Sequence, residues 1–150
     1  MPVLPFLLCT WFGLGKLPKG PGTWGSLGAL PFAWGLQMAG GPTVLLAATI
    51  AISLLSLWAI AEYLKHQPGE DPGEIVIDEV AGQWLTLAFV PLDWRLYVIG
   101  FVAFRIFDIF KPWPVSWADR RIGGARGVLL DDLLAGIYAM LVMFILLHFW

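Results

Sequence analysis

The chain has 150 residues, of which 59% are hydrophobic and only 13% are charged, with a formal net charge of −2. A soluble domain typically carries about 25% charged residues, so this composition favours a protein whose solvent is lipid. The length suits one domain over residues 1–150, and the small net charge predicts no nucleic-acid partner. The single cysteine, Cys9, excludes an internal disulfide and a cysteine-based metal cluster.

The N-terminal residues 3–14 are apolar but too short to span a membrane. As a helix they would measure about 18 Å, well under the bilayer core of roughly 30 Å. No basic region precedes them and no small-residue cleavage site follows, so they do not fit a cleaved signal peptide. We expect an interfacial or partly inserted segment.

Five longer apolar stretches follow, separated by three polar segments and two tight turns. The stretches are residues 27–39, 43–61, 75–90, 94–110 and 128–150. The polar segments are residues 15–26, 62–74 and 111–127, and the turns are residues 40–42 and 91–93. Lipid cannot satisfy an open backbone, so these stretches predict helices. The expected fold is an all-α polytopic membrane bundle of four to five membrane-embedded helices, with two hairpins and a C-terminal helix.

The two tight turns place all three polar segments on one side of the membrane, because each hairpin returns the chain to the face from which it entered. Most lysine and arginine residues fall in those segments, and Arg95 alone lies at the opposite turn. This excess predicts that the polar face is cytoplasmic. The short stretch 27–39 is either spanning or re-entrant, and both alternatives preserve this sidedness.

Two pairs of acidic residues interrupt the apolar stretches: Asp78 with Glu79, and Asp131 with Asp132. Gly82 lies four residues after the first acid of the first pair, and Gly136 four residues after the second acid of the second pair. Residues four apart share a helix face, and a glycine there lets another backbone or a ligand approach closely. Both acidic pairs are expected at helix N-termini, where the helix dipole favours carboxylates.

A polar stripe of Arg105, Asp108 and Lys111, spaced by three, is expected on the fourth stretch. Paired carboxylates are the hard oxygen ligands that suit Mg²⁺, while two histidines and one cysteine disfavour zinc. Cations beside such a metal site suit phosphate, so the combination predicts phosphoryl chemistry. Taken alone, the Arg105–Asp108 pair favours a structural ion pair.

Residues 13–26 are rich in glycine and come directly before the first long stretch. A glycine-rich turn at the start of a helix presents backbone N–H groups to an anion. The Walker pattern is missing, so nucleotide binding is not implied. Gly22, Thr23 and Ser26 are candidate phosphate contacts, although a simple N-cap role for Thr23 or Ser26 is equally compatible.

The ordered motifs of the chain resemble the phosphatidylglycerophosphatase A family of bacterial lipid phosphatases. They are Gly15 with Pro18, Pro21-Gly22-Thr23 with Gly25-Ser26, Ile75-Val76-Ile77-Asp78-Glu79 with Gly82, Phe104-Arg105-Ile106-Phe107-Asp108, Lys111-Pro112-Trp113-Pro114, Gly123-Gly124, and Asp131-Asp132 with Ala135-Gly136. The resemblance covers nearly the whole chain. It implies a multi-pass, Mg²⁺-dependent enzyme of the bacterial inner membrane, with its active site facing the cytoplasm. Such enzymes remove the terminal phosphate of phosphatidylglycerophosphate to give phosphatidylglycerol.

The expected roles divide the polar residues into metal ligands and residues that bind the phosphate or the attacking water. The expected metal ligands are Asp78, Glu79, Asp131 and Asp132. Asp108 would ligate metal or orient the attacking water, while Arg105 and Lys111 would hold the phosphate. Asp131 and Asp132 point about 100° apart on a helix, so we expect their roles to differ. A metal-activated water is the expected nucleophile, and an aspartyl-phosphate intermediate is the alternative.

A small transporter or ion-conducting protein is the competing hypothesis, with the embedded carboxylates as a proton or cation path. Such a protein should carry polar groups through the membrane midplane. The interior of the stretch 43–61 offers only Thr49, Ser53 and Ser56. A conducting path also has no need of a cationic cluster of the kind that binds phosphate. The oligomeric state is not predicted by the sequence.

Overall fold

The computed structural model describes residues 2–66 and 73–150, and within them the chain forms six α-helices, one 3-10 turn and no β-strand. The helices are α1 (Val3–Cys9), α2 (Pro21–His66), α3 (Ile77–Leu87), α4 (Trp94–Phe110), α5 (Val115–Arg121) and α6 (Gly124–Phe149), and the 3-10 turn is η1 (Leu14–Lys16). The prediction of an all-α fold is confirmed. The middle of the predicted polar segment 62–74 lies outside the described residues.

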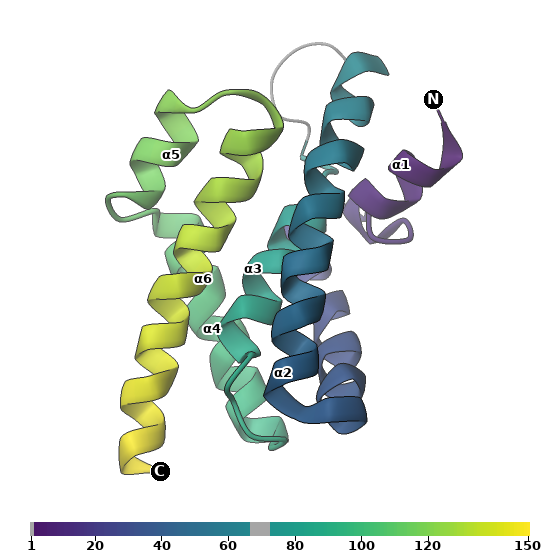
Figure 1. The fold of residues 1–150 in the computed structure, drawn as a ribbon. Coiled ribbons are helices and arrows are strands. Elements are labelled where there is room, and N and C mark those ends of the chain that lie inside the picture. Colours follow the sequence, from purple (N-terminus) through teal and green to yellow (C-terminus); the bar gives the residue numbers. More distant parts are fainter. Residues whose placement is uncertain (1, 67–72) are drawn as a thin grey trace.

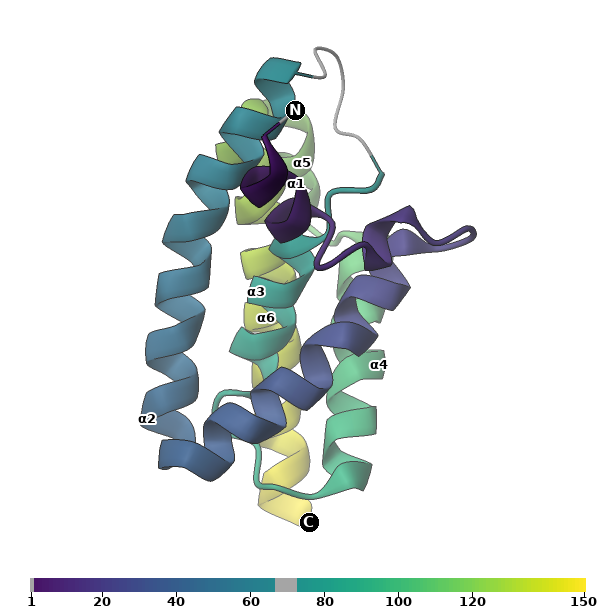
Figure 2. The same cartoon turned by 90° about the vertical axis from the view of Figure 1, so that its right-hand side faces the viewer.

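The long element α2 is a hairpin of two helical arms. The arms meet at Gly40 and Gly41, whose backbone angles are not helical. Gly41 has a φ of 73°, in the left-handed region that glycine adopts without strain. Figure 2 shows the two arms diverging from this kink. The predicted hairpin of the first two apolar stretches is confirmed, but its first arm begins at Pro21 rather than at residue 27.

The remaining helices follow the predicted order with different bounds. α4 occupies residues 94–110 as predicted, α3 is shorter than its apolar stretch, and α6 begins at Gly124 rather than at residue 128. α5 lies in a segment for which no helix was predicted. Of the helices described, α2 and α6 are long and apolar enough to cross a membrane. The full count of four to five embedded helices stays a prediction.

The two ends of the bundle carry different connections (Figure 1). The kink of α2, the connection from α3 to α4, and the C-terminus lie at one end. The end of α2 and the short helix α5 lie at the opposite end. This arrangement is what two successive hairpins require.

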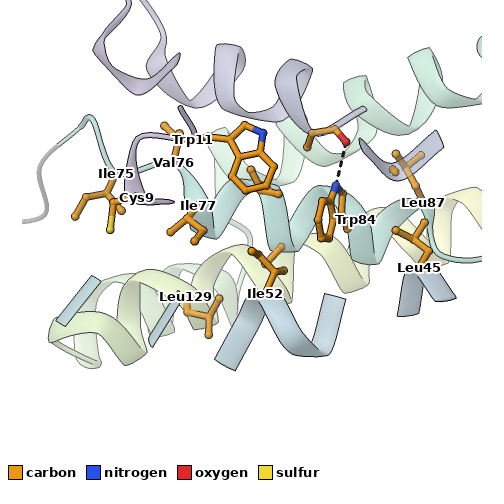
Figure 3. Close-up of a cluster of buried hydrophobic side chains, with 14 of the residues drawn as sticks. Cys9, Trp11, Leu45, Ile52, Ile75, Val76, Ile77, Trp84, Leu87 and Leu129 are labelled. Carbon is orange, nitrogen blue, oxygen red and sulfur yellow. Dashed lines mark hydrogen bonds between the residues drawn. The ribbon is translucent and has the colours of Figure 1, made fainter. Parts of the chain in front are cut away.

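A buried apolar cluster joins the N-terminal segment, α2 and α3 (Figure 3). The indole N–H of Trp84 donates to the carbonyl of Ala29 at 3.0 Å, and the ring of Trp11 meets that of Trp84 edge-on at 5.9 Å. The indole of Trp11 also donates to the carbonyl of Gly28 at 3.3 Å. These contacts hold the first arm of α2 against α3.

The helices α3 and α6 cross at two glycines. A Cβ atom on Gly136 would lie 2.6 Å from the carbonyl oxygen of Gly82, and one on Gly82 would lie 2.6 Å from the carbonyl oxygen of Asp132. The hydroxyl of Thr86 on α3 donates to the carbonyl of Gly82 on its own helix at 3.0 Å and lies 3.4 Å from the carbonyl oxygen of Gly136. The predicted close approach is confirmed, and the approaching group is the backbone of the other helix. It brings the acidic residues of α3 beside those of α6.

The end of α3 that is remote from these acids is held by one buried amide. The side-chain nitrogen of Gln37 donates to the carbonyls of Leu87, Ala88 and Val90 at 3.3, 3.3 and 2.9 Å. The hydroxyl of Tyr97 on α4 donates to the amide oxygen of Gln37. Carbonyls at a helix end lack partners within the helix, so this Gln37 clasp satisfies them from α2.

Candidate active site

Five carboxylates converge where α3, α4 and α6 meet. They come from Asp78 and Glu79 of α3, Asp108 of α4, and Asp131 and Asp132 of α6. Carboxylate oxygens lie within 4.8 Å of one another in two triads, which are Asp78–Asp131–Asp132 and Glu79–Asp108–Asp132. Asp132, only 2% exposed, belongs to both triads. The structure therefore brings together all four of the expected metal ligands and adds Asp108.

The two acidic pairs differ in their position along their helices. Asp78 and Glu79 lie in the first turn of α3, as expected. The same expectation for Asp131 and Asp132 is wrong, because α6 begins at Gly124 and has no acidic residue in its first turn. The helix dipole acts mainly within the first turn, so it does not stabilise this second pair. Their negative charge needs cations instead.

Arg105 and Lys111 supply positive charge to the cluster. Arg105 donates through Nη1 to Oδ2 of Asp108, and its side chain is only 15% exposed. The Nζ atom of Lys111 lies 3.2 Å from Oδ2 of Asp131, 3.8 Å from Oδ1 of Asp108 and 4.0 Å from Oδ1 of Asp119. The stripe expected from the spacing of Arg105, Asp108 and Lys111 is therefore a connected set of ion pairs.

The surroundings of Lys111 keep it charged. Lys111 ends α4 in a left-handed conformation, with a φ of 50°, directly before Pro112. Burial lowers the pKa of its amine, but the carboxylates of Asp131, Asp108 and Asp132 outweigh burial and hold that pKa well above its usual value. Lys111 is therefore a fixed point charge for an anionic ligand.

The start of α2 lies against the same cluster. A Cβ atom on Gly22 would lie 2.8 Å from Oε1 of Glu79 and 3.0 Å from Nη1 of Arg105. The missing side chain leaves a cradle between an acid and a guanidinium. Thr23 and Ser26 also lie inside α2 rather than in a loop before it, and the Ser26 hydroxyl is buried. Among the described residues, Gly22 is the one through which the start of α2 contacts the acidic cluster.

Several buried polar atoms of the cluster have no hydrogen-bond partner within residues 2–66 and 73–150. They are Oδ1 of Asp78, Oε2 of Glu79, Oδ1 of Asp131, Oδ1 of Asp132 and Nε of Arg105. Each buried polar atom left unpaired costs about 1–3 kcal/mol, and charged groups cost more. Hard carboxylate oxygens in such a set fit a divalent cation of the Mg²⁺ type, and the free guanidinium nitrogen fits an anion.

The sequence had not singled out Asp119 and Gln83. Asp119 of α5 approaches Lys111, but nothing in its polar segment signalled that contact. Gln83 is fully buried, and neither its side-chain nitrogen nor its oxygen has a partner in the described part of the chain. An amide directly after Gly82, between the apolar residues Ala81 and Trp84, was the available signal.

The three hydroxyls inside the second arm of α2 do not form a polar path. Thr49 donates to the carbonyl of Leu45 at 2.8 Å, Ser53 to that of Thr49 at 2.7 Å, and Ser56 to that of Ser53 at 2.8 Å. Each hydroxyl is thus satisfied by its own helix. This geometry gives the transport hypothesis no support.

Two helices long and apolar enough to cross a membrane, together with buried carboxylates beside an arginine and a lysine, suit an enzyme that acts on phosphate esters at a membrane. The sequence profile of the family described as Phosphatidylglycerophosphatase A matches residues 7–147. The chain belongs to the phosphatidylglycerophosphatase A family and is a lipid phosphatase. The family resemblance noted from the motifs is confirmed.

Three curated relatives are similar to the chain over most of its length. Phosphatidylglycerophosphatase A of Escherichia coli (strain K12) is 40% identical over 150 residues, covering 96% of this chain and 84% of the relative. Phosphatidylglycerophosphatase A of Haemophilus influenzae is 35% identical over 145 residues, covering 96% and 88%. A Bacteroides thetaiotaomicron protein with the name "Putative phosphatidylinositol-3-phosphatase" is 42% identical over 147 residues, covering 93% and 91%. No solved structure matches the chain.

Proposed function

We propose that the protein hydrolyses the terminal phosphate monoester of phosphatidylglycerophosphate in a Mg²⁺-dependent reaction, giving phosphatidylglycerol and inorganic phosphate. The observation that carries this proposal is the sharing of Asp132 by two carboxylate triads with Arg105 and Lys111 in contact. Membership of the family, and the names of the relatives from E. coli and H. influenzae, support the choice of substrate.

The charge of the cluster supports a role for metal. Five carboxylates face the two cations Arg105 and Lys111, which leaves three negative charges without a partner when all the acids are ionised. Burying unpaired charge is costly, so bound divalent cations would balance this excess. The ligands would be Asp78, Glu79, Asp131 and Asp132, with Asp108 in the second triad. Bound Mg²⁺ would supply Lewis-acid activation and neutralise charge on the phosphate.

The two cations would bind the phosphate of the substrate in different ways. Asp108 holds Nη1 of the Arg105 guanidinium, Nη1 and Nη2 lie beside the Gly22 cradle, and the buried Nε has no partner among the described residues. A planar guanidinium held in this way matches two phosphate oxygens, whereas Lys111 acts as a point charge. Both would offset negative charge that develops in the transition state. Thr23 and Ser26 would complete the phosphate site from α2.

Asp108 would orient the attacking water. Its Oδ2 accepts from Arg105, and its Oδ1 lies 3.8 Å from Lys111, so Oδ1 is free to accept a hydrogen bond from water. Water would then form a bond to phosphorus while the bond from phosphorus to the glycerol oxygen breaks, and one proton of the water would pass through solvent to the departing glycerol oxygen. The other four acids would serve as metal ligands, which favours water over an aspartate as the nucleophile.

We also propose that residues 1–150 form one domain of the inner membrane, with the α5 end of the bundle in the cytoplasm. The end that carries α5 also carries most of the basic residues, as the positive-inside rule requires. The two arms of α2, together with α4 and α6, would span the bilayer. α3 has 11 residues and a length of about 16 Å, so it would be embedded without spanning.

The test is phosphate release from phosphatidylglycerophosphate in non-ionic micelles, with and without Mg²⁺. Asp132→Asn keeps the size of the side chain but removes the charge that both triads share. Metal activation contributes several kcal/mol, and about 1.4 kcal/mol corresponds to tenfold, so we expect turnover to fall by about 10²-fold or more. Wild type should also gain thermal stability from Mg²⁺, and Asp132→Asn should lose most of that gain.

The matched control is Asp93→Asn at the remote end of the bundle. Asp93 caps α4, and asparagine is an equally good N-cap, so this variant should keep both activity and the response to Mg²⁺. Full Mg²⁺-dependent turnover together with full Mg²⁺ stabilisation in Asp132→Asn would refute the metal site. Absence of phosphate release from wild type at any Mg²⁺ concentration would refute the proposed reaction.

A further inference from the structure

A pocket of about 490 Å³ opens at α5 and the turn before it. It is lined by Trp113, Trp117, Arg120 and Arg121. Trp117, Arg120 and Arg121 are three and four residues apart on α5, a spacing that places side chains on neighbouring parts of one helix face. The volume lies within the range of about 300–1,000 Å³ that is typical of sites for small molecules.

The chemistry of this pocket suits an anionic amphiphile. In the part of the chain that the structure describes, neither arginine forms an ion pair with a carboxylate. Arg120 donates to the carbonyl of Ser116 at a long 3.4 Å. Trp113 is 74% exposed and Trp117 45% exposed, as expected of indoles at a membrane–water interface. Two guanidiniums without a carboxylate partner among the described residues, beside two indoles, therefore offer anion binding and apolar contact together.

The residues that line the pocket are linked to Lys111 and α6 by chain neighbours and one hydrogen bond. Trp113 follows Lys111 by two residues, and Asp119, the neighbour of Arg120, lies 4.0 Å from the Lys111 amine. The hydroxyl of Tyr138 on α6 donates to the carbonyl of Trp113 at 2.5 Å. These contacts tie both ends of the pocket to the helices that carry the acids. These links are what a ligand that extends from Lys111 into the pocket would require.

We propose that this pocket binds the phosphodiester group of the substrate lipid while Arg105 and Lys111 bind its terminal phosphomonoester. The proposal rests on the proposed function, because phosphatidylglycerophosphate carries both groups, separated by one glycerol. Planar guanidiniums bind phosphate oxygens in pairs, and the indoles contact the glycerol carbons above the acyl chains. The enzyme then selects phosphate monoesters whose headgroup contains a second phosphate.

The kinetic test uses the double variant Arg120→Gln/Arg121→Gln. Both side chains are exposed, so the variant should fold as wild type does. Phosphate release from phosphatidylglycerophosphate is measured in non-ionic detergent micelles, which carry no competing phosphodiester. We expect KM to rise about tenfold or more while kcat changes less than twofold, since binding of a non-reacting group is lost.

The matched control, Arg126→Gln/Lys65→Gln, removes two exposed positive charges from outside the pocket and should keep both constants. Phosphatidylglycerol, which has the phosphodiester without the monoester, should compete with substrate in wild type and about tenfold more weakly in the pocket variant. Binding of labelled phosphatidylglycerol to each purified protein in the same micelles gives a readout that needs no turnover.

The outcomes separate this inference from the proposed function. An active wild type with an unchanged KM in the pocket variant overturns the pocket and leaves the function intact. Activation of wild type by phosphatidylglycerol, in place of competition, means that the pocket holds a neighbouring lipid, and the proposal is wrong. If wild type releases no phosphate, the proposed function fails, and equal binding of labelled phosphatidylglycerol by wild type and the pocket variant overturns the pocket as well.

Discussion

Gly136→Ala places one methyl group at the closest contact between α3 and α6. Its Cβ would lie 2.6 Å from the carbonyl oxygen and 3.2 Å from the Cα of Gly82, whereas ordinary van der Waals contact begins at 3.4 Å. The helices must therefore separate by about 0.8 Å, and overpacking of this kind costs about 1–3 kcal/mol of unfolding free energy. The separation also moves Asp132 away from Asp78. Because a misplacement of about 1 Å can cost about 10²-fold in rate, we expect turnover to fall by about ten- to a hundredfold.

The assay combines phosphate release with thermal unfolding in the same micelles. Gly35→Ala is the matched control, because a Cβ on Gly35 meets nothing within 4 Å and Gly35 lies in the first arm of α2. Alanine at this helical position should leave turnover unchanged and raise stability slightly. The reasoning fails if Gly136→Ala is as active and as stable as Gly35→Ala. Tight contact between α3 and α6 would then be irrelevant to the geometry of the acids.

Two further predictions concern the phosphate cation and the topology. Arg105→Lys keeps the charge but loses the two-pronged fit to phosphate oxygens, so phosphate release should fall by about tenfold or more. The control variant Arg126→Lys should match wild type. Equal rates of phosphate release by Arg105→Lys and wild type would remove Arg105 from the phosphate site. In a Cys9→Ala background, the His66→Cys variant should react with an impermeant thiol reagent only from the cytoplasmic side. The Leu92→Cys variant should react only from the opposite side. Labelling of position 66 from outside alone would invert the proposed orientation.

The sequence predicted the elements whose boundaries coincide with strong local signals. α4 begins directly after the N-cap Asp93, which accepts a hydrogen bond from the backbone N–H of Arg95, and it ends before Lys111 and the following proline. Both signals are local, so the sequence predicts the bounds of α4. The convergence of the acids was also readable, because each pair lies one turn from a glycine. Two small residues on neighbouring helices permit the close crossing that brings Asp78 to Asp132.

The boundaries that were missed depend on packing rather than on local preference. α6 begins within a glycine-rich run that favours a loop, yet Gly127 fits there because a Cβ would lie 1.8 Å from the carbonyl oxygen of Ile122. α5 has only seven residues and is held by burial of Val115 and Ala118. The early start of α2 likewise depends on Gly25, where a Cβ would lie 2.6 Å from Val76. Such contacts become visible only when the partner element is in place.

The Gln37 clasp gives the protein an order of assembly. α3 is shorter than a bilayer core, so its C-terminal end would lie within the bilayer, where each carbonyl without a partner would cost several kcal/mol. Gln37 meets the carbonyls of Leu87 and Ala88 at this end, and that of Val90 just beyond it, from the first arm of α2, which precedes α3 in the chain. The α2 hairpin is made first, so it provides the partner that the end of α3 needs as α3 inserts. A chain made in two pieces would recover the fold only when the piece with Gln37 is present as the other inserts.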